Sequence, residues 1–206
     1  MKTMLRYLAL GLALLSTLLS VSACFPLVAG GAVMTGFVAV DRRTSGAMLE
    51  DQSIELKIGS RIRDALGEKV HINVTSYNRK VLLTGEAPDQ KDKERAGEIA
   101  KATDNISSVW NEVGVTSITS LTERTNDLIA AGRIKADLID AKDLFSNAYK
   151  IVVERGTVYV MGRITAREAK RVSSVVSGVT GVKKVVLVHE TITEDELANL
   201  QAKPAN

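Results

Sequence analysis

The segments Val81-Leu82-Leu83-Thr84-Gly85 and Val158-Tyr159-Val160-Met161-Gly162 decide the fold, because they are the same signal at two places in the chain. Each is a β-rich run closed by a glycine, the residue for which a positive φ or a tight turn is easiest. The two glycines, at positions 85 and 162, lie 77 residues apart. The chain therefore predicts two copies of one structural unit.

A β-hairpin is predicted at each glycine strand. The upstream strand runs from His71 to Ser76 in the first half and from Lys150 to Glu154 in the second. Only Tyr77-Asn78-Arg79 or Arg155-Gly156 separates it from the glycine strand, and such short connections are typical of hairpins. Both halves therefore contain the same pair of antiparallel strands.

Helices are predicted on both sides of each hairpin. Upstream, apolar residues recur at intervals of three and four, which places them on one helical face: Ile54, Ile58, Ile62 and Leu66 in the first half, and Ile134, Leu138, Ala141 and Phe145 in the second. A second helix opens at Pro88-Asp89 or at the capping box Thr165-Ala166-Arg167-Glu168. A β-branched run follows, Ile106 to Val115 or Val179 to Val188. The predicted class is α+β, with two tandem αββαβ modules, each a mixed three-stranded sheet packed by two helices.

The first 23 residues are typical of a signal peptide. Lys2 and Arg6 precede an apolar stretch from Leu8 to Leu19 that is too short to span a bilayer. The next segment, Val21-Ser22-Ala23-Cys24, resembles the lipobox of bacterial lipoproteins, which implies cleavage before Cys24 and its acylation, palmitate included. Phe25 favours onward export to the periplasmic face of the outer membrane. The alternative is an ordinary signal peptide followed by an incidental cysteine.

The two repeats resemble the BON domain, a bacterial module of periplasmic and envelope proteins. The resemblance covers residues 51–117 and 124–192. Besides the glycine strands, the motifs that carry it are Ile72-Asn73-Val74-Thr75 with Tyr77, Arg167-Glu168-Ala169 and Gly178-Val179-Thr180-Gly181-Val182-Lys183. With the lipobox and the linker segment Asp41-Arg42-Arg43-Thr44-Ser45-Gly46, the chain is similar to the double-BON outer-membrane lipoproteins linked to division and envelope stress. That resemblance implies binding of anionic phospholipid and a role in envelope integrity.

The segments outside the modules and the charge balance refine this interpretation. Residues 24–50 are interpreted as a lipidated linker and residues 193–206 as a flexible tail. The part from Phe25 to Val40 is uncharged and apolar, so it lies against the membrane surface or serves as a plain tether. Residues 47–116 hold 10 Lys and Arg against 12 Asp and Glu, whereas residues 122–192 hold 12 against 8. The second module is therefore the one expected to meet acidic lipid head groups.

The first helix of the second module is the predicted lipid-binding element. Helical rotation places Leu128, Lys135, Ile139 and Lys142 together beside the core stripe, and Ile129 and Arg133 on a further face near the helix start. Apolar residues with lysine neighbours suit an interfacial helix on phosphatidylglycerol or cardiolipin membranes. Family members often carry Asp-Thr-Trp where this chain has Asp127, Leu128 and Ile129. The alternative is that Leu128 and Ile139 form an interdomain contact.

Binding rather than catalysis is the expected activity. The two histidines, His71 and His189, fall in different modules and lack companions at metal-ligand spacing, so no metal or cofactor is expected. No part of the charge pattern requires nucleic acid. Trp110 is expected in the core or between the modules, with an exposed anchor as the alternative. A protein-interaction adaptor for envelope assembly or division machinery is the rival function.

Overall fold

A computed structural model of the chain describes residues 41–201, so the signal peptide, Cys24 and the segment 25–40 lie outside the described residues. The first module begins with helix α2 (Ser45–Leu66), which is followed by the short 3-10 helix η2 (Gly67–Lys69). Strands β1 (His71–Tyr77) and β2 (Lys80–Ala87), helix α3 (Gln90–Lys101) and strands β3 (Ser108–Asn111) and β4 (Gly114–Val115) complete it. Strand β1 pairs with β2 antiparallel, and both β3 and β4 pair with β2 in parallel.

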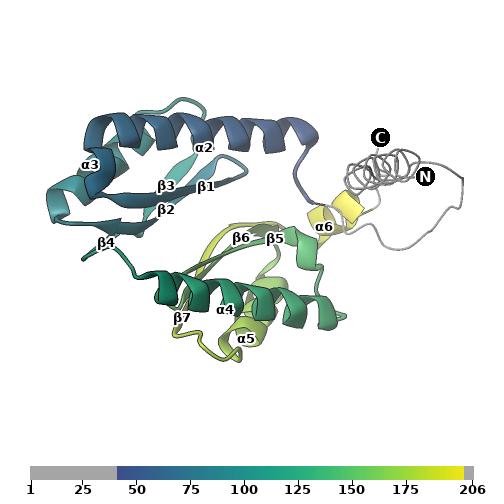
Figure 1. Cartoon of the computed structure of the whole chain (residues 1–206). Coiled ribbons are helices and arrows are strands. Elements are labelled where there is room, and N and C mark those ends of the chain that lie inside the picture. The colour runs from purple at the N-terminus through teal and green to yellow at the C-terminus, as the bar shows by residue number, and fades with distance from the viewer. Residues whose placement is uncertain (1–40, 202–206) are drawn as a thin grey trace, which may run out of the picture. The chain divides into compact units, whose positions relative to one another are not determined.

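The second module repeats this order. It consists of helix α4 (Leu121–Asp140), the 3-10 helix η3 (Ser146–Ala148), strands β5 (Tyr149–Glu154) and β6 (Thr157–Ile164), helix α5 (Ala166–Ser177) and strand β7 (Lys184–Thr191). Strand β6 is central, antiparallel to β5 and parallel to β7. Figure 1 shows α2 and α3 on one face of the first sheet and α4 and α5 on one face of the second. The predicted pair of αββαβ modules with mixed sheets is confirmed, but the first sheet has four strands instead of three, because its last predicted strand is divided into β3 and β4.

The helical core stripes are as predicted, with one exception. Ile54, Ile58, Ile62 and Leu66 are all buried under the first sheet, as are Ile134 and Leu138 under the second. Phe145, however, is 39% exposed, because α4 ends at Asp140 and the helical spacing that would bring Phe145 to the core does not continue. Leu144 is buried there instead. The prediction for Phe145 was wrong.

The two hairpins turn in the same way. Asn78 and Arg79 both have positive φ, and so do Arg155 and Gly156, as a two-residue turn of the type that matches strand twist requires. The glycine strands run on past their glycines to Ala87 and Ile164, so the glycines lie inside the strands rather than at their ends. Gly85 has a φ of 101°, and a Cβ there would lie 2.0 Å from the carbonyl oxygen of His71. Only glycine fits this position.

Each sheet uses its two faces differently. Val81 and Leu83 of β2 face the helices of the first module, whereas Leu82 between them packs against the second module, as strand alternation requires. A buried cluster of Tyr77 and Leu82 with residues of the second module, Tyr159, Met161 and Val188, joins the helix-free faces of the two sheets. Trp110 packs against this cluster, which confirms its expected place between the modules. Both modules belong to one compact unit, Ala39–Asn206.

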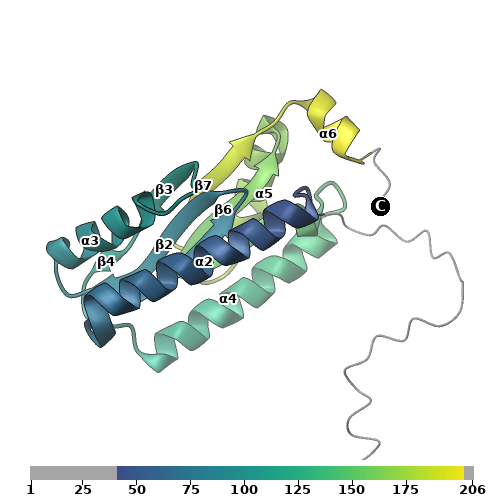
Figure 2. The same cartoon turned by 90° about the horizontal axis from the view of Figure 1, so that it is seen from above.

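The boundaries of the linker and the tail differ from the predicted ones. Helix α2 begins at Ser45, where the side chain of Thr44 caps it, so residues 45–50 belong to the first module and not to the linker. The polar tail contains helix α6 (Glu194–Gln201), which follows β7 in Figure 2. Its N-terminus is closed by reciprocal hydrogen bonds between Thr193 and Glu196, and Leu197 is buried. Sequence reasoning missed this capping box.

The end of the linker is bound to both modules. The buried guanidinium of Arg42 forms two hydrogen bonds, of 2.7 and 2.8 Å, with the carboxylate of Glu168 in the second module. It also donates to the carbonyl oxygen of Arg163 at 2.7 Å. The next residue, Arg43, forms an ion pair with Asp51 of the first module and stacks over Tyr77, with its guanidinium carbon 4.2 Å from the ring centroid. Two consecutive arginines thus hold the start of the described chain against both domains.

Candidate functional site

The solvent face of α4 carries a stripe of exposed apolar side chains. Leu121, Leu128 and Ile139 are 81%, 72% and 62% exposed. At about 100° per residue these three positions fall within about 20° of one another, and about 140° from the buried stripe centred on Ile134. A helix of a small domain normally turns polar residues to solvent at this angle. We call Leu121, Leu128 and Ile139 the apolar stripe.

The structure places the predicted lipid-binding residues in two groups. Leu128 and Ile139 lie on the apolar stripe with Lys135 beside them, as helical rotation predicted. The ammonium group of Lys135 donates to the carbonyl oxygen of Ser146 at 2.9 Å and to the side-chain oxygen of Asn147 at 3.1 Å, so Lys135 also holds the loop after α4. Lys142 lies beyond the helix, because α4 ends at Asp140, and its predicted place on the helical flank was wrong.

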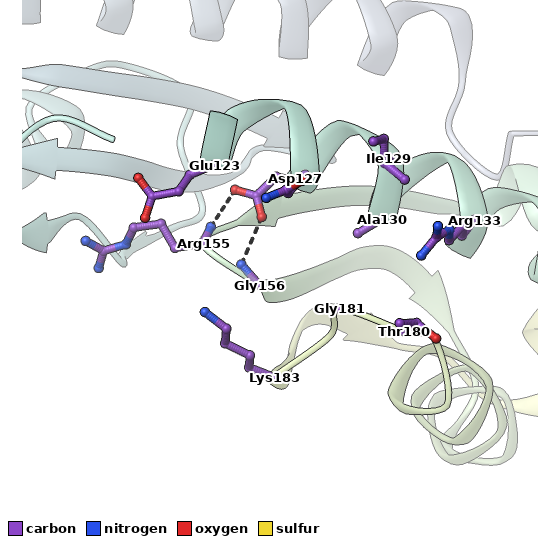
Figure 3. A pocket seen from close by; sticks show the side chains of 11 residues that line it. Glu123, Asp127, Ile129, Ala130, Arg133, Arg155, Gly156, Thr180, Gly181 and Lys183 are labelled. Atoms are coloured by element: carbon purple, nitrogen blue, oxygen red, sulfur yellow. Dashed lines mark hydrogen bonds between the residues drawn. The ribbon is translucent and has the colours of Figure 1, made fainter. Parts of the chain in front are cut away.

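Ile129 and Arg133 form the second group, on the flank that sequence analysis assigned to them. They line a pocket of about 360 Å³ between α4, the β5–β6 turn and the turn that follows α5. Figure 3 shows this pocket, with Lys183 rising from one wall and Arg133 extending from α4 on the other. The sequence separated the residues of this pocket by up to 60 positions, from Glu123 to Lys183, so periodicity could not bring them together.

The interdomain contact does not use the apolar stripe. The modules meet through the helix-free faces of their sheets, in the cluster that includes Tyr77. Leu128 and Ile139 lie outside this contact and remain exposed to solvent. The alternative that these two residues pack between the domains is therefore wrong. Leu121 also belongs to the stripe, and sequence reasoning missed it although it lies seven residues before Leu128.

Asp127 has a structural task in the second module. Its carboxylate accepts hydrogen bonds from the backbone N–H groups of Arg155 and Gly156, at 2.7 and 2.9 Å. Asp51, which lies 76 residues earlier, does the same for the Asn78–Arg79 turn. The aspartate that begins the family-like triplet therefore fixes the hairpin turn to the helix.

This equivalence allows the two long helices to be compared position by position. With Asp51 matched to Asp127, the stripe positions Leu121, Leu128 and Ile139 correspond to Ser45, Gln52 and Arg63 in α2. The first module thus has polar or charged residues at all three places, although its core stripe is equally apolar. Apolar residues at these three positions therefore occur only in the second module, although α2 exposes Met48, Leu49 and Leu56 elsewhere on its surface.

A buried acidic group that sequence reasoning missed lies where the modules approach each other. The carboxylate of Glu86 is fully buried, accepts a short hydrogen bond from the hydroxyl of Thr119 and lies 3.3 Å from Nδ1 of His71. Burial raises the pKa of Glu154 in the second module, and the nearby charge of Glu86 adds to the effect. His71 thus has a neighbouring carboxylate, but within residues 41–201 no three metal-binding side chains gather into a possible site.

Among the helices of the described chain, none has the length and apolar character needed to cross a membrane.

Comparison with known proteins agrees with the repeat. The family model described as "BON domain" matches residues 50–117 and 126–188. The chain is 29% identical over 177 residues to outer membrane lipoprotein DolP of Haemophilus influenzae, which covers 85% of this chain and 92% of that protein. It is also 29% identical over 151 residues to a 21 kDa hemolysin of Actinobacillus pleuropneumoniae, covering 72% of this chain and 78% of that one.

A solved structure of CdsD, a structural protein of the type III secretion system of Chlamydia trachomatis, covers 77% of this chain and 99% of its own. Its TM-score of 0.30 and its 13% identity are too low to carry a functional argument.

Proposed function

The chain belongs to the BON-domain family, and we propose that it is an outer-membrane lipoprotein that faces the periplasm and binds anionic phospholipid through its second BON domain. The lipobox-like segment ending in Cys24 supports the anchor, as does the similarity to a lipoprotein of the outer membrane. The observation that carries the lipid-binding proposal is the apolar stripe on α4. Support for envelope integrity and for the response to envelope stress is part of the same proposal.

The energetics of the apolar stripe fit a weak membrane contact. Full burial of a leucine or isoleucine side chain contributes roughly 1.5–3 kcal/mol, and insertion at an interface recovers part of that for each of three residues. The basic excess of residues 122–192, 12 Lys and Arg against 8 acidic residues, adds attraction to an anionic leaflet. Acyl chains on Cys24 would keep the domain near the surface at a high effective concentration, so that a weak site suffices.

The first module supplies the substitutions for a sharp test. We would make the mature chain with Cys24→Ala and replace Leu121 and Leu128 by the residues at the matching positions of α2, giving Leu121→Ser and Leu128→Gln. Flotation with phosphatidylglycerol vesicles should fall by about tenfold or more, since two exposed side chains no longer insert. Leu56→Gln, which changes a leucine of the first module that is 67% exposed, is the matched control.

Two results would contradict this function. A folded Leu121→Ser/Leu128→Gln protein that floats like the wild type removes the apolar stripe from lipid binding. Bare Cys24 in the natively expressed protein, measured by mass spectrometry, removes the anchor. The expected results are reduced flotation and an acylated residue 24.

A protein-interaction adaptor is the second candidate, and one observation favours it. Met48, Leu49 and Leu56 leave further apolar side chains exposed on α2, and the first two line a second hollow of about 570 Å³ that α2 forms with Lys150 of the second module. An adaptor with the Cys24→Ala change would remain in solution with pure lipid vesicles, whereas the lipid-binding protein would float. In either case we propose binding and not catalysis, without cofactor or nucleic acid.

A further inference from the structure

The pocket on the second module is open because two glycines stand where the first module has side chains. The β5–β6 turn, Arg155-Gly156, corresponds to Asn78-Arg79, and the bend before the third strand has Gly181 where the first module has Asn105. Gly181 and Asn105 both have positive φ, 99° and 64°. The two modules therefore share a backbone at this place but differ in what fills it.

In the first module the corresponding space is occupied by the protein itself. The guanidinium of Arg79 donates from Nε to the carbonyl oxygen of Asn105 at 2.6 Å. The amide of Asn105 donates in turn to the carboxylate of Glu50 at 2.9 Å. These contacts join the hairpin turn, the bend and the long helix.

In the second module glycines occupy both positions, so neither position can make the corresponding side-chain contacts. A Cβ on Gly156 would lie 3.0 Å from Cδ of Lys183, so the stem of that lysine packs directly over the turn. A Cβ on Gly181 would lie 3.9 Å from Cβ of Ala130 on α4, which is ordinary contact. The resulting pocket of about 360 Å³ holds Arg133 and Lys183 as shown in Figure 3.

The acidic groups of the pocket are already paired. Asp127 accepts from the two backbone N–H groups of the turn. Glu123 accepts from the backbone and hydroxyl of Ser120; these hydrogen bonds lower the pKa of Glu123, and the charges of Lys183 and Arg155 lower it further. The side chains of Arg133 and Lys183, by contrast, form no hydrogen bond or ion pair within the described part of the chain, although the backbone N–H of Lys183 donates to the carbonyl oxygen of Gly156 at 2.8 Å. The groups left to bind a ligand are therefore cationic.

We propose that this pocket binds a phosphate group, and that in the cell the phosphate belongs to a phospholipid head group. This proposal rests on the proposed lipid-binding function and adds a second contact between the second module and the membrane. The apolar stripe would give affinity for any bilayer, whereas Arg133 and Lys183 would supply the preference for anionic lipid. On α4, Ile129 lines the pocket and lies by helical rotation between the apolar stripe and Arg133.

The test compares two neighbouring lysines in the Cys24→Ala chain. Lys183→Ser introduces the residue of the matching position in the first module, Ser107, and removes a pocket cation. Lys184→Ser removes the same charge from the adjacent exposed position, outside the pocket, and is the matched control. Gly181→Asn narrows the pocket without changing charge, by a residue that the first module accepts at positive φ. Flotation is measured with phosphatidylglycerol and with phosphatidylcholine vesicles.

We expect Lys183→Ser and Gly181→Asn each to weaken phosphatidylglycerol binding by about fivefold, the value of one lost phosphate contact, with phosphatidylcholine binding unchanged. Lys184→Ser should change binding to either kind of vesicle by less than about twofold. Equal effects of the two lysine variants, together with wild-type binding by Gly181→Asn, would overturn the pocket assignment and leave the lipid-binding function standing.

Titration with glycerol 3-phosphate, followed by the amide signals of Gly156 and Gly181, separates a head group from a soluble phosphate. Shifts that disappear in Lys183→Ser support the phosphate site. If the wild-type protein does not bind phosphatidylglycerol vesicles, the proposed lipid-binding function is wrong. In that case, glycerol 3-phosphate shifts that disappear in Lys183→Ser would assign the pocket to a soluble phosphate ester, and the absence of these shifts would overturn the phosphate site as well.

Discussion

Replacing Arg42 by alanine should destabilise the protein far more than the loss of any surface ion pair. The side chains of Arg42 and Glu168 are 5% and 1% exposed and are joined at 2.7 Å. Removing one partner of a buried pair costs about 3–5 kcal/mol, because the remaining charge is left without compensation. Glu168 keeps its hydrogen bond from the backbone of Thr165 at 3.0 Å, so we expect the lower end, about 3 kcal/mol.

The assay is denaturant unfolding followed by the fluorescence of Trp110, the single tryptophan, which packs between the modules. Arg171→Ala is the matched control, since Arg171 and Asp143 form a pair at the same 2.7 Å distance but are 46% and 51% exposed. That loss should leave the unfolding midpoint almost unchanged, and its small effect should shrink with salt. Equal midpoints for the Arg42 and Arg171 variants would refute the reasoning, because they would show that burial of the Arg42 pair has no energetic consequence.

Three further predictions concern glycines of the backbone and the two aspartates that accept hydrogen bonds from the hairpin turns. Gly85→Ala should cost about 3 kcal/mol or more in unfolding free energy, since its Cβ would overlap the His71 carbonyl, whereas Gly132→Ala, with open space around it, should stabilise α4 by roughly 0.5–1 kcal/mol. Asp127→Ala should cost about 1–3 kcal/mol and increase hydrogen exchange at the β5–β6 turn, because two N–H groups lose their acceptor. Burial alone would raise the pKa of Asp51, but hydrogen bonds from Arg79, Ser76 and Arg43 lower it overall. The stability that Asp51 contributes is therefore present above its usual pKa of 3.8 and is lost as the pH falls through the lower pKa of the folded protein. Acid titration of Asp51→Asn should therefore show a shallower loss below about pH 4 than the wild type, and parallel curves would contradict it.

The sequence predicted those features that depend on local spacing. Helical stripes such as Ile54 to Leu66, the hairpins and the cap at Thr165 follow from periodicity and side-chain chemistry within a few residues. The same reasoning failed at Phe145, where α4 stops at Asp140 without a glycine or proline to mark its end. A helix terminus set by tertiary packing leaves little trace in the residues beside it.

The arrangement of the modules could not be predicted, because its contacts join residues far apart in the chain. Arg42 and Glu168 are 126 positions apart, and each lies in a polar segment of the kind that is typical of a protein surface. Strand alternation turns Leu82 away from the helices, but no residue near it in the sequence indicates that the second sheet covers it. The pocket was missed for the same reason, since Gly156 and Gly181 have meaning only beside α4.

Duplication explains how the proposed lipid-binding features can be confined to one module. Both copies keep the groups that define the fold: an aspartate under the hairpin turn, positive φ at the turn and the bend, and an apolar core stripe on the long helix. They differ at solvent-facing positions, where almost any residue is accepted at a small cost in folding stability. Leu128 is 72% exposed, and the matching Gln52 shows that folding does not require an apolar residue there. A single exposed leucine would need no explanation, but folding does not account for three apolar residues aligned on one solvent face of α4, and the proposed contact with a lipid surface would.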